Sequence, residues 1–199
     1  MTQTLKLPQL AWYGAKELEI KLPRSWRVEV CHMAGHDRPR MKSAAIKKAI
    51  TNPIGRPPLR EYARGKKEVV ILFDDMARVT RVSEMVPHVL AELAAAGIAD
   101  KQVRFIAANG CHGAMDRQAF ARKLGEGVLA RFPVYNHAPF DNCVYAGTTR
   151  RGTRILINAE VMKCDLKIGI GSIVPHIMAG FGGGGKIVLP GVAAYETYR

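Results

Sequence analysis

The glycine-rich segment at residues 169–191 constrains the fold of this chain more than any other feature. Glycine adopts positive φ angles and lets a ligand approach the backbone, so successive N–H groups can converge on an anion such as phosphate. His176 and Lys186 add an imidazole and an amine to this segment. Flexible linkers usually combine glycine with serine and other polar residues. The segment therefore predicts a loop that holds a ligand.

The residues around this loop indicate the kind of fold that carries it. Residues 164–170 have the pattern of a short buried strand, and open α/β sheets bind ligands at the carboxyl ends of their strands. Gly180 to Lys186 also match the G-x-x-x-x-G-K loop of nucleoside triphosphatases, in which a following Ser or Thr ligates magnesium. Ile187 occupies that position and cannot ligate a hard cation. The sequence therefore disfavours an ATP-hydrolysing loop.

Strand and helix patterns alternate along the chain, which predicts an α/β fold with a mostly parallel sheet flanked by helices, in a Rossmann-like arrangement of three layers. We expect one α/β domain over residues 1–199. Ser83 is a candidate N-cap for the second helix. The expected strands are 18–22, 68–73, 103–108 and 166–170 with shorter pieces at 144–145 and 154–157, and the expected helices are 41–51, 83–96 and 116–124.

Polar and ionisable side chains follow three of these strands directly. Because the carboxyl ends of parallel strands meet at one edge of a sheet, we expect these groups to surround a single cleft. The two aspartates can instead cap a following helix, and the arginine can simply pair with one of them. The groups are Asp74, Asp75 and Arg78 after residue 73, Asn109 and His112 after residue 108, and His176 and Lys186 after residue 170.

The composition is that of an ordinary globular protein, with 48% hydrophobic and 24% charged residues. No apolar run approaches the roughly 20 residues that span a bilayer, and the N-terminus lacks the apolar core of a signal peptide. We therefore expect a cytoplasmic protein with no membrane partner. The cysteines form no C-x-x-C pair, so we expect reduced thiols, and a metal site at Cys31, His32 and His36 is disfavoured.

The net charge of +13 is concentrated in residues 38–67, where basic side chains outnumber acidic ones. Such a patch can bind nucleic acid by releasing counterions. It lacks the interleaved aromatic residues of a base-stacking surface and any known nucleic-acid module. We therefore expect a solvated face or a surface that meets an acidic partner domain, and no nucleic-acid partner.

Several motifs resemble the N-terminal half of the nickel-dependent lactate racemase family. The resemblance runs from about residue 13 to residue 199, and the segment around His176 and Lys186 is its longest and most specific part. It rests on residues 52–59, 75–80, 109–112, 145–153 and 169–191.

This resemblance implies a racemase or epimerase of small 2-hydroxy acids that works by reversible hydride transfer. The family's cofactor is a nickel-pincer nucleotide, the nickel complex of pyridinium-3,5-bisthiocarboxylic acid mononucleotide. By resemblance, Lys186 would hold this cofactor covalently through a thioamide. The glycines expected to surround the cofactor are Gly182, Gly183, Gly184 and Gly185.

The resemblance also implies roles for the ionisable groups. His112 and His176 match the family's two catalytic histidines, one serving each enantiomer, and imidazole suits this task because it exchanges protons near neutral pH. Arg78 would clamp the substrate carboxylate, and Asp75 would help to orient that site. Departures from the usual family residues at Cys111, Val174 and neighbouring positions leave open which 2-hydroxy acid is the substrate.

Family members are longer, with a C-terminal α/β domain that closes over the cofactor. The family's nickel-binding histidine would lie beyond Arg199, so we expect no metal ligand in this chain and no activity from the chain alone. Two other functions stay open. One is a stand-alone nucleotide- or phosphate-binding module without catalysis, and the other is a basic interaction domain.

Overall fold

The computed structural model describes residues 1–9, 12, 16–36 and 38–199, and the chain divides into two compact units, Met1–Lys42 and Ser43–Arg199. In the first unit, β1 (Thr2–Leu7) pairs antiparallel with β2 (Leu18–Pro23), from Thr2 opposite Pro23 to Leu7 opposite Leu18. The strand expected at 18–22 is therefore present. The sequence predicted one α/β domain over all 199 residues, whereas the α/β architecture occupies the second unit.

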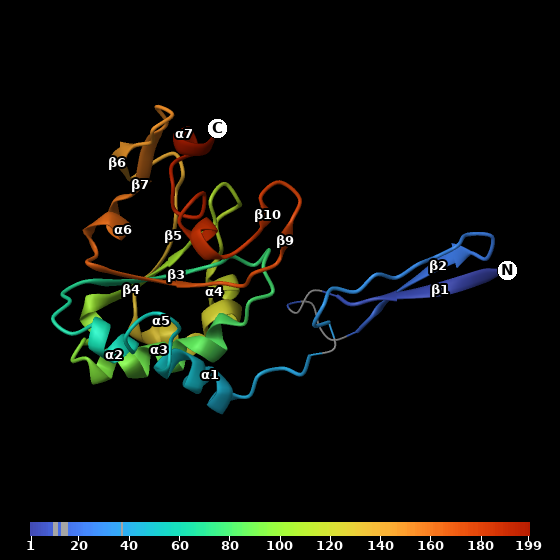
Figure 1. Cartoon of the computed structure of the whole chain (residues 1–199), viewed down its shortest axis with the longest axis horizontal. Helices are drawn as coiled ribbons and strands as arrows, with labels where there is room; N and C mark the ends of the chain where they lie inside the picture. Colours follow the sequence, from blue (N-terminus) through green and yellow to red (C-terminus); the bar gives the residue numbers. More distant parts are fainter. Residues whose placement is uncertain (10–11, 13–15, 37) are drawn as a thin grey trace. The chain divides into compact units, whose positions relative to one another are not determined.

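A four-stranded parallel sheet forms the centre of the second unit, in the order β5-β4-β3-β8 (Figure 1). Its strands are β3 (Val69–Phe73), β4 (Val103–Ala107), β5 (Val134–Asn136) and β8 (Leu166–Ile170). β3 pairs in register with both β4 and β8, so Phe73 lies opposite Ala107 on one side and Ile170 on the other. The expected α/β fold with a parallel sheet is confirmed.

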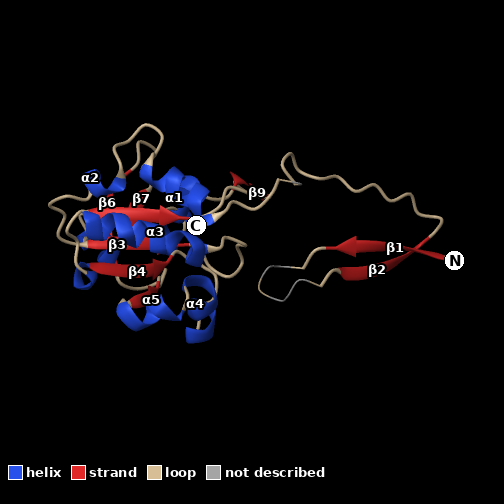
Figure 2. Ribbon diagram, turned by 90° about the horizontal axis from the view of Figure 1, so that it is seen from below, coloured by secondary structure: helices blue, strands red, loops and turns tan. Residues whose placement is uncertain are grey.

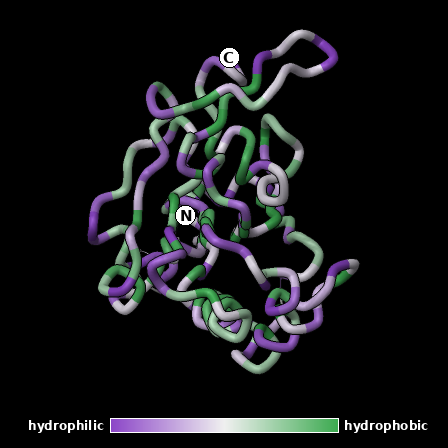
Figure 3. Tube along the Cα trace, turned by 90° about the vertical axis from the view of Figure 1, so that its left-hand side faces the viewer, coloured by the Kyte–Doolittle hydropathy of each residue, from purple (hydrophilic) through white to green (hydrophobic). Residues whose placement is uncertain are grey.

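Every residue of β3 is buried, because both faces of the sheet are covered. Val69, Ile71 and Phe73 belong to the larger apolar core, and Val70 and Leu72 belong to the smaller one on the opposite face. This accounts for the continuous apolar run in the sequence, which is typical of parallel strands. Figure 3 shows hydrophobic and hydrophilic segments alternating along the chain.

Helices cover one face of the sheet, and a mixed layer covers the other (Figures 1 and 2). The helical layer contains α1 (Ser43–Thr51), α2 (Leu59–Tyr62), α3 (Val82–Ala95), α4 (Arg117–Leu124) and α5 (Glu126–Arg131), with a 3-10 turn η1 (Asp100–Gln102) before β4. The other layer contains the antiparallel pair β6 (Cys143–Thr148) and β7 (Arg154–Asn158), then α6 (Ala159–Lys163) and α7 (Tyr195–Tyr198).

The expected helices are present, with one correction at a helix start. α3 begins at Val82, and Arg81 occupies its N-cap position without a side-chain hydrogen bond, so Ser83 is not the N-cap. In α4 the Asp116 carboxylate accepts a hydrogen bond of 2.7 Å from the amide of Ala119, which is the usual role of an N-cap. Among the described residues, no helix is long and apolar enough to cross a membrane.

The glycine-rich segment leaves β8 and returns to the same edge of the sheet. It contains the small hairpin β9 (Pro175–His176) and β10 (Gly180–Phe181), followed by the 3-10 turn η2 (Gly184–Ile187). Gly191 then accepts a hydrogen bond of 3.0 Å from the amide of Gly110, next to the end of β4. A side chain on Gly191 would overlap the carbonyl of Ile187, so this close return requires glycine.

Candidate active site

The turn after β3 presents two carboxylates and a guanidinium group. Its backbone closes through a hydrogen bond of 3.1 Å from the amide of Arg78 to the carbonyl of Asp75. The buried Asp75 carboxylate accepts a hydrogen bond from the amide of Ala77 at 2.8 Å, which caps the turn locally. Oδ1 of this carboxylate thus holds the turn, and Oδ2 faces another residue of the site.

The loop after β4 places His112 against that second oxygen. The buried Asn109 organises the loop, since its side-chain amide donates to the carbonyls of His112 and His137 at 3.1 and 3.3 Å. His112 Nδ1 lies 2.5 Å from Asp75 Oδ2. A carboxylate only accepts hydrogen bonds, so Nδ1 carries the proton and neutral His112 keeps an unprotonated Nε2. The side chain of His112 is 54% exposed and lines the pocket described below.

His176 has the opposite arrangement of ring nitrogens. Its Nδ1 accepts hydrogen bonds from the amides of Met178 and Ala179, at 3.2 and 3.3 Å. A backbone amide only donates, so neutral His176 carries its proton on Nε2. Partial burial, followed by the nearby charges of Lys186, Arg78 and His112, lowers the pKa of His176. The site therefore contains one imidazole with a free lone pair and one with a free N–H.

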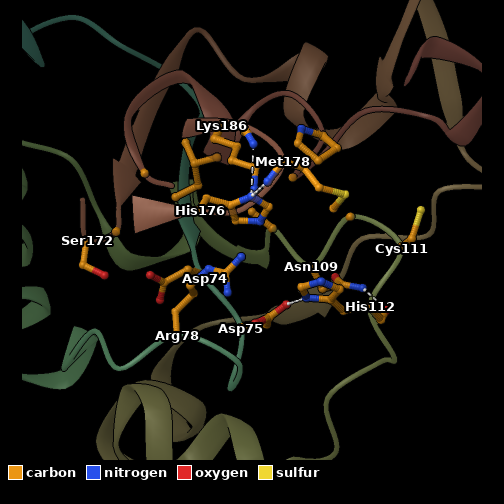
Figure 4. Close-up of a pocket in the computed structure, with 18 of the residues that line it drawn as sticks. Asp74, Asp75, Arg78, Asn109, Cys111, His112, Ser172, His176, Met178 and Lys186 are labelled. Atoms are coloured by element: carbon orange, nitrogen blue, oxygen red, sulfur yellow. Dashed lines mark hydrogen bonds and ion pairs between the residues drawn. The ribbon is translucent and has the colours of Figure 1, made fainter. Parts of the chain in front are cut away.

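Lys186 lies on η2 and is partly buried. Desolvation, and secondly the positive charge of Arg78, lower the pKa of its amine. Both effects favour the neutral amine, which is the nucleophilic form. Figure 4 shows the Arg78 side chain extending toward His176, with Lys186 beside that histidine and the Asp75–His112 pair across from it.

These groups line one pocket with a volume of about 320 Å³. The sequence-predicted residues Asp75, Arg78, His112, His176 and Lys186 all contribute to its wall, as does Gly183. Gly182, Gly184 and Gly185 are not among the described residues that line it. The structure thus brings together the ionisable groups that sequence reasoning placed at the carboxyl edge of the sheet.

The conformation of Gly183 explains one glycine of the loop without a ligand. Its φ is +77°, and a side chain there would overlap the carbonyl oxygen of Ser172. Gly184 also has a positive φ of +54° but open space around it, and Gly185 has open space as well. The run of glycines therefore serves close backbone packing at Gly183 and leaves Gly184 and Gly185 sterically accessible.

The sequence reasoning did not predict the contacts of Cys111, and it missed Tyr198 and Lys123 altogether. Tyr198 and Cys111 form part of the pocket wall, with Oη and Sγ 2.7 Å apart, and burial followed by this contact raises the pKa of Tyr198. Lys123 lies beneath the turn after β3 and pairs with Asp74 at 2.7 Å. The sequence hints at this burial only through spacing. Lys123 lies three residues after Phe120, which places both side chains on the buried face of α4. The described residues include no group of three or more His, Cys, Asp or Glu side chains that could hold a metal ion.

A family model and two related proteins all connect this chain with lactate racemase. A family model described as the lactate racemase N-terminal domain matches residues 13–199. The chain is 34% identical over 154 residues to a lactate racemase of Lactiplantibacillus plantarum, covering 76% of this chain and 36% of that protein. It is 32% identical over 189 residues to a lactate racemase of Thermoanaerobacterium thermosaccharolyticum, covering 92% of this chain and 44% of that protein.

The fold is similar to a solved structure as well. The lactate racemase apoprotein of Thermoanaerobacterium thermosaccharolyticum superimposes with a TM-score of 0.73 at 27% sequence identity, covering 96% of this chain and 44% of that chain. The chain thus spans less than half the length of the relatives that it matches.

Proposed function

Because the chain belongs to the lactate racemase N-terminal domain family, we propose that it is the cofactor-holding part of a racemase or epimerase of small 2-hydroxy acids. The observation that carries this proposal is the composition of one pocket. Two imidazoles with opposite free ring nitrogens, a guanidinium group and an amine of lowered pKa line the same cavity. This is the set of groups needed to bind a carboxylate, move a proton and hold a cofactor.

The residues fit a nickel-pincer nucleotide joined to Lys186. An amine that is neutral in a larger fraction of molecules is the nucleophile needed for a thioamide bond. The amides around the accessible Gly184 and Gly185 suit an anionic group such as the nucleotide phosphate. When bound, this cofactor supplies the acceptor and donor of hydride. We place the nickel-binding histidine in the C-terminal portion that the relatives have and this chain does not span.

The chain's own residues would handle the substrate's carboxylate and hydroxyl proton. The planar guanidinium of Arg78 pairs with a carboxylate in two parallel hydrogen bonds, which orients the acid. When hydride leaves C2 with its electron pair, the hydroxyl proton must leave too, and a planar keto acid results. Return of hydride to the opposite face, together with a proton to the oxygen, gives the other enantiomer.

His112 and His176 differ in how readily they take the hydroxyl proton. The free Nε2 of His112 can accept it at once, and Asp75 stabilises the imidazolium that forms. His176 can act as a base only after its proton moves to Nδ1, which displaces the amides of Met178 and Ala179. We propose that His112 is the base for one enantiomer in the resting site, and that His176 serves the other after the β9–β10 turn relaxes.

Intact-mass spectrometry tests the cofactor assignment. The chain is co-expressed with the enzymes that synthesise the nickel-pincer nucleotide, and the wild type is compared with Lys186→Arg, which keeps the positive charge. We expect a covalent adduct on the wild type and none on the variant, with peptide mapping locating it at Lys186. A stand-alone nucleotide- or phosphate-binding module, or a basic interaction domain, predicts no covalent adduct on either protein. That result would exclude the proposed tether.

A further inference from the structure

Lys123 is a fully buried lysine directly beneath the candidate active site. It lies in the last turn of α4, and its side chain has 0% exposure. Phe120 and Leu124 share the buried face of this helix. Burying an ammonium group costs several kcal/mol unless the charge is paired and its N–H groups are bonded. An apolar side chain would fill this position at lower cost, so the lysine requires an explanation other than packing.

The ammonium group contacts both ends of the turn that carries the site. Lys123 Nζ lies 2.9 Å from the carbonyl oxygen of Asp75 and 2.9 Å from that of Arg78. It also lies 2.7 Å from Asp74 Oδ1. Two of its N–H groups thus donate to backbone carbonyls, and the charge pairs with the Asp74 carboxylate. Lys123 therefore fixes the backbone of the turn at the residues whose side chains enter the pocket.

Asp74, the ion-pair partner of Lys123, is linked in turn to the glycine-rich segment. Asp74 Oδ2 accepts a hydrogen bond from the hydroxyl of Thr80, and the Thr80 hydroxyl lies 2.7 Å from that of Ser172, which lines the pocket. Burial lowers the pKa of Lys123, and the adjacent Asp74 opposes this effect by favouring the charged form. Through Asp74 and Thr80, Lys123 is thus connected to the segment after β8 as well as to the turn after β3.

We propose that Lys123 is a positioning residue: it holds the turn at residues 75–78 so that Asp75 keeps His112 protonated on Nδ1, with Nε2 free toward the pocket. The Asp75 carboxylate is held on one side by the amide of Ala77, within the turn that the hydrogen bond from Arg78 to Asp75 closes. Loss of the ammonium group removes its hydrogen bonds to the carbonyls of Asp75 and Arg78 and so weakens the turn. Asp75 then no longer determines which nitrogen of His112 carries the proton.

This inference rests on the proposed function only for the role of His112 as a base. Its test therefore uses the 199-residue chain without cofactor or substrate, so a failure to racemise leaves the test unaffected. Long-range ¹H–¹⁵N correlation spectra of histidine-labelled protein distinguish the two neutral imidazole tautomers. The His112 signals are assigned by their loss in His112→Gln. Lys123→Met has nearly the same length without the charge, and Arg122→Met changes the exposed neighbouring residue of the same helix as a matched control.

We expect the wild type and Arg122→Met to show His112 protonated on Nδ1. In Lys123→Met the Nδ1-protonated fraction should fall at least twofold, while the dispersed amide spectrum of the folded sheet is retained. A folded Lys123→Met with the wild-type tautomer would contradict the proposal. So would a wild type whose His112 carries its proton on Nε2.

A second measurement on the wild type keeps the inference testable if Lys123→Met does not fold. The ammonium group of Lys123 should give a distinct ¹H–¹⁵N signal that is protected from solvent exchange, because its N–H groups bond to protein acceptors. Trans-hydrogen-bond couplings should connect it to the carbonyl carbons of Asp75 and Arg78. A folded protein in which every lysine ammonium group exchanges at the rate of an exposed side chain would overturn the assignment.

Discussion

At the scale of single residues, the site depends on which partner each ionisable side chain meets. Asp75 and His112 are paired at 2.5 Å, and the amides of Met178 and Ala179 contact His176. Sequence reasoning placed these residues at one edge of the sheet because each follows a strand. It could not supply the ring-nitrogen assignments, because they depend on contacts between segments far apart in the chain.

Lys123 is a second residue whose role could not be predicted from the sequence, because that role depends on tertiary contacts. A lysine between Arg122 and Leu124 on a short helix is typical of a solvated surface, and it became a site residue only once α4 packed beneath the turn after β3. The alternative that an aspartate caps the following helix was wrong, because Arg81 occupies the N-cap position of α3. Asp75 instead holds its own turn through the amide of Ala77, and this same carboxylate contacts His112.

Arg78 and Lys186 give a prediction about amine reactivity. Burial and the charge of Arg78 lower the pKa of Lys186, so its neutral fraction at pH 7.5 exceeds that of an ordinary lysine. Arg78→Gln removes the second cause, which raises this pKa and slows acylation of Lys186. Competitive labelling with an amine-reactive ester, read by peptide mass spectrometry, measures the rate. Arg150→Gln in the exposed β6–β7 turn is the control, and equal Lys186 rates in the two variants would disprove the effect.

His137 gives a prediction about stability and pH. Its Nε2 donates to the carbonyl of Ala193 at 2.9 Å, its Nδ1 accepts from Asn158 at 3.2 Å, and burial lowers its pKa. The unfolded chain therefore binds the proton at higher pH than the folded chain. The stability is complete above the unfolded pKa of about 6.5 and declines as the pH falls below it toward the lower folded value.

Thermal unfolding between pH 7.5 and 5.5 tests this linkage. The wild type should lose more stability over this interval than His137→Gln, whose neutral amide does not titrate. The variant is expected to be less stable at pH 7.5, because it disturbs a buried hydrogen-bond network. A pH dependence that is the same in both proteins would show that another group is responsible.

At the scale of elements, the long periodic segments were predictable and the short ones were not. The buried runs of β3 and β4 and the helices α1, α3 and α4 follow from their apolar patterns. β5 has three residues and β9 and β10 have two each, too few to show a period. Their positions are set by tertiary contacts, such as the hydrogen bond of 2.7 Å from the amide of Gly182 to the carbonyl of Val174.

The glycine-rich loop provides a prediction at this scale. Gly183→Ala places a side chain against the carbonyl of Ser172 at a positive φ, and such strain costs roughly 1–3 kcal/mol. Gly185→Ala meets open space and should change stability by about 0.5 kcal/mol or less. Chemical denaturation measures both free energies of unfolding, and amide exchange at Gly182 reports the loop. Equal values for the two variants would mean that the loop does not pack as described.

At the scale of the whole molecule, the β9–β10 hairpin, whose His176 and Met178 line the pocket, has an exposed apolar surface. Ile173, Ile177, Met178 and Phe181 are 74%, 99%, 85% and 64% exposed, on or beside the β9–β10 hairpin. Single exposed apolar residues are common, but a cluster of this kind usually marks an interface. The matched relatives are more than twice as long as the stretch that this chain covers. We propose that their C-terminal portion covers this hairpin and completes the cleft.

Solvent protection tests this arrangement. When the chain is joined to the C-terminal portion of the Thermoanaerobacterium relative, amide exchange in residues 173–181 should slow relative to the chain alone. Exchange in the exposed β6–β7 turn serves as an internal comparison. Unchanged exchange in residues 173–181 would place the interface elsewhere.

The chiral assay of that joined protein tests the central claim most directly. Circular dichroism follows a single enantiomer of lactate, and of longer 2-hydroxy acids, with protein whose Lys186 adduct has been verified by mass. We expect racemisation of at least one of these acids by the joined protein, none by the chain alone, and a loss of at least about 100-fold in each of His112→Ala and His176→Ala. Robust racemisation by the chain alone, or full activity in both histidine variants, would contradict this account.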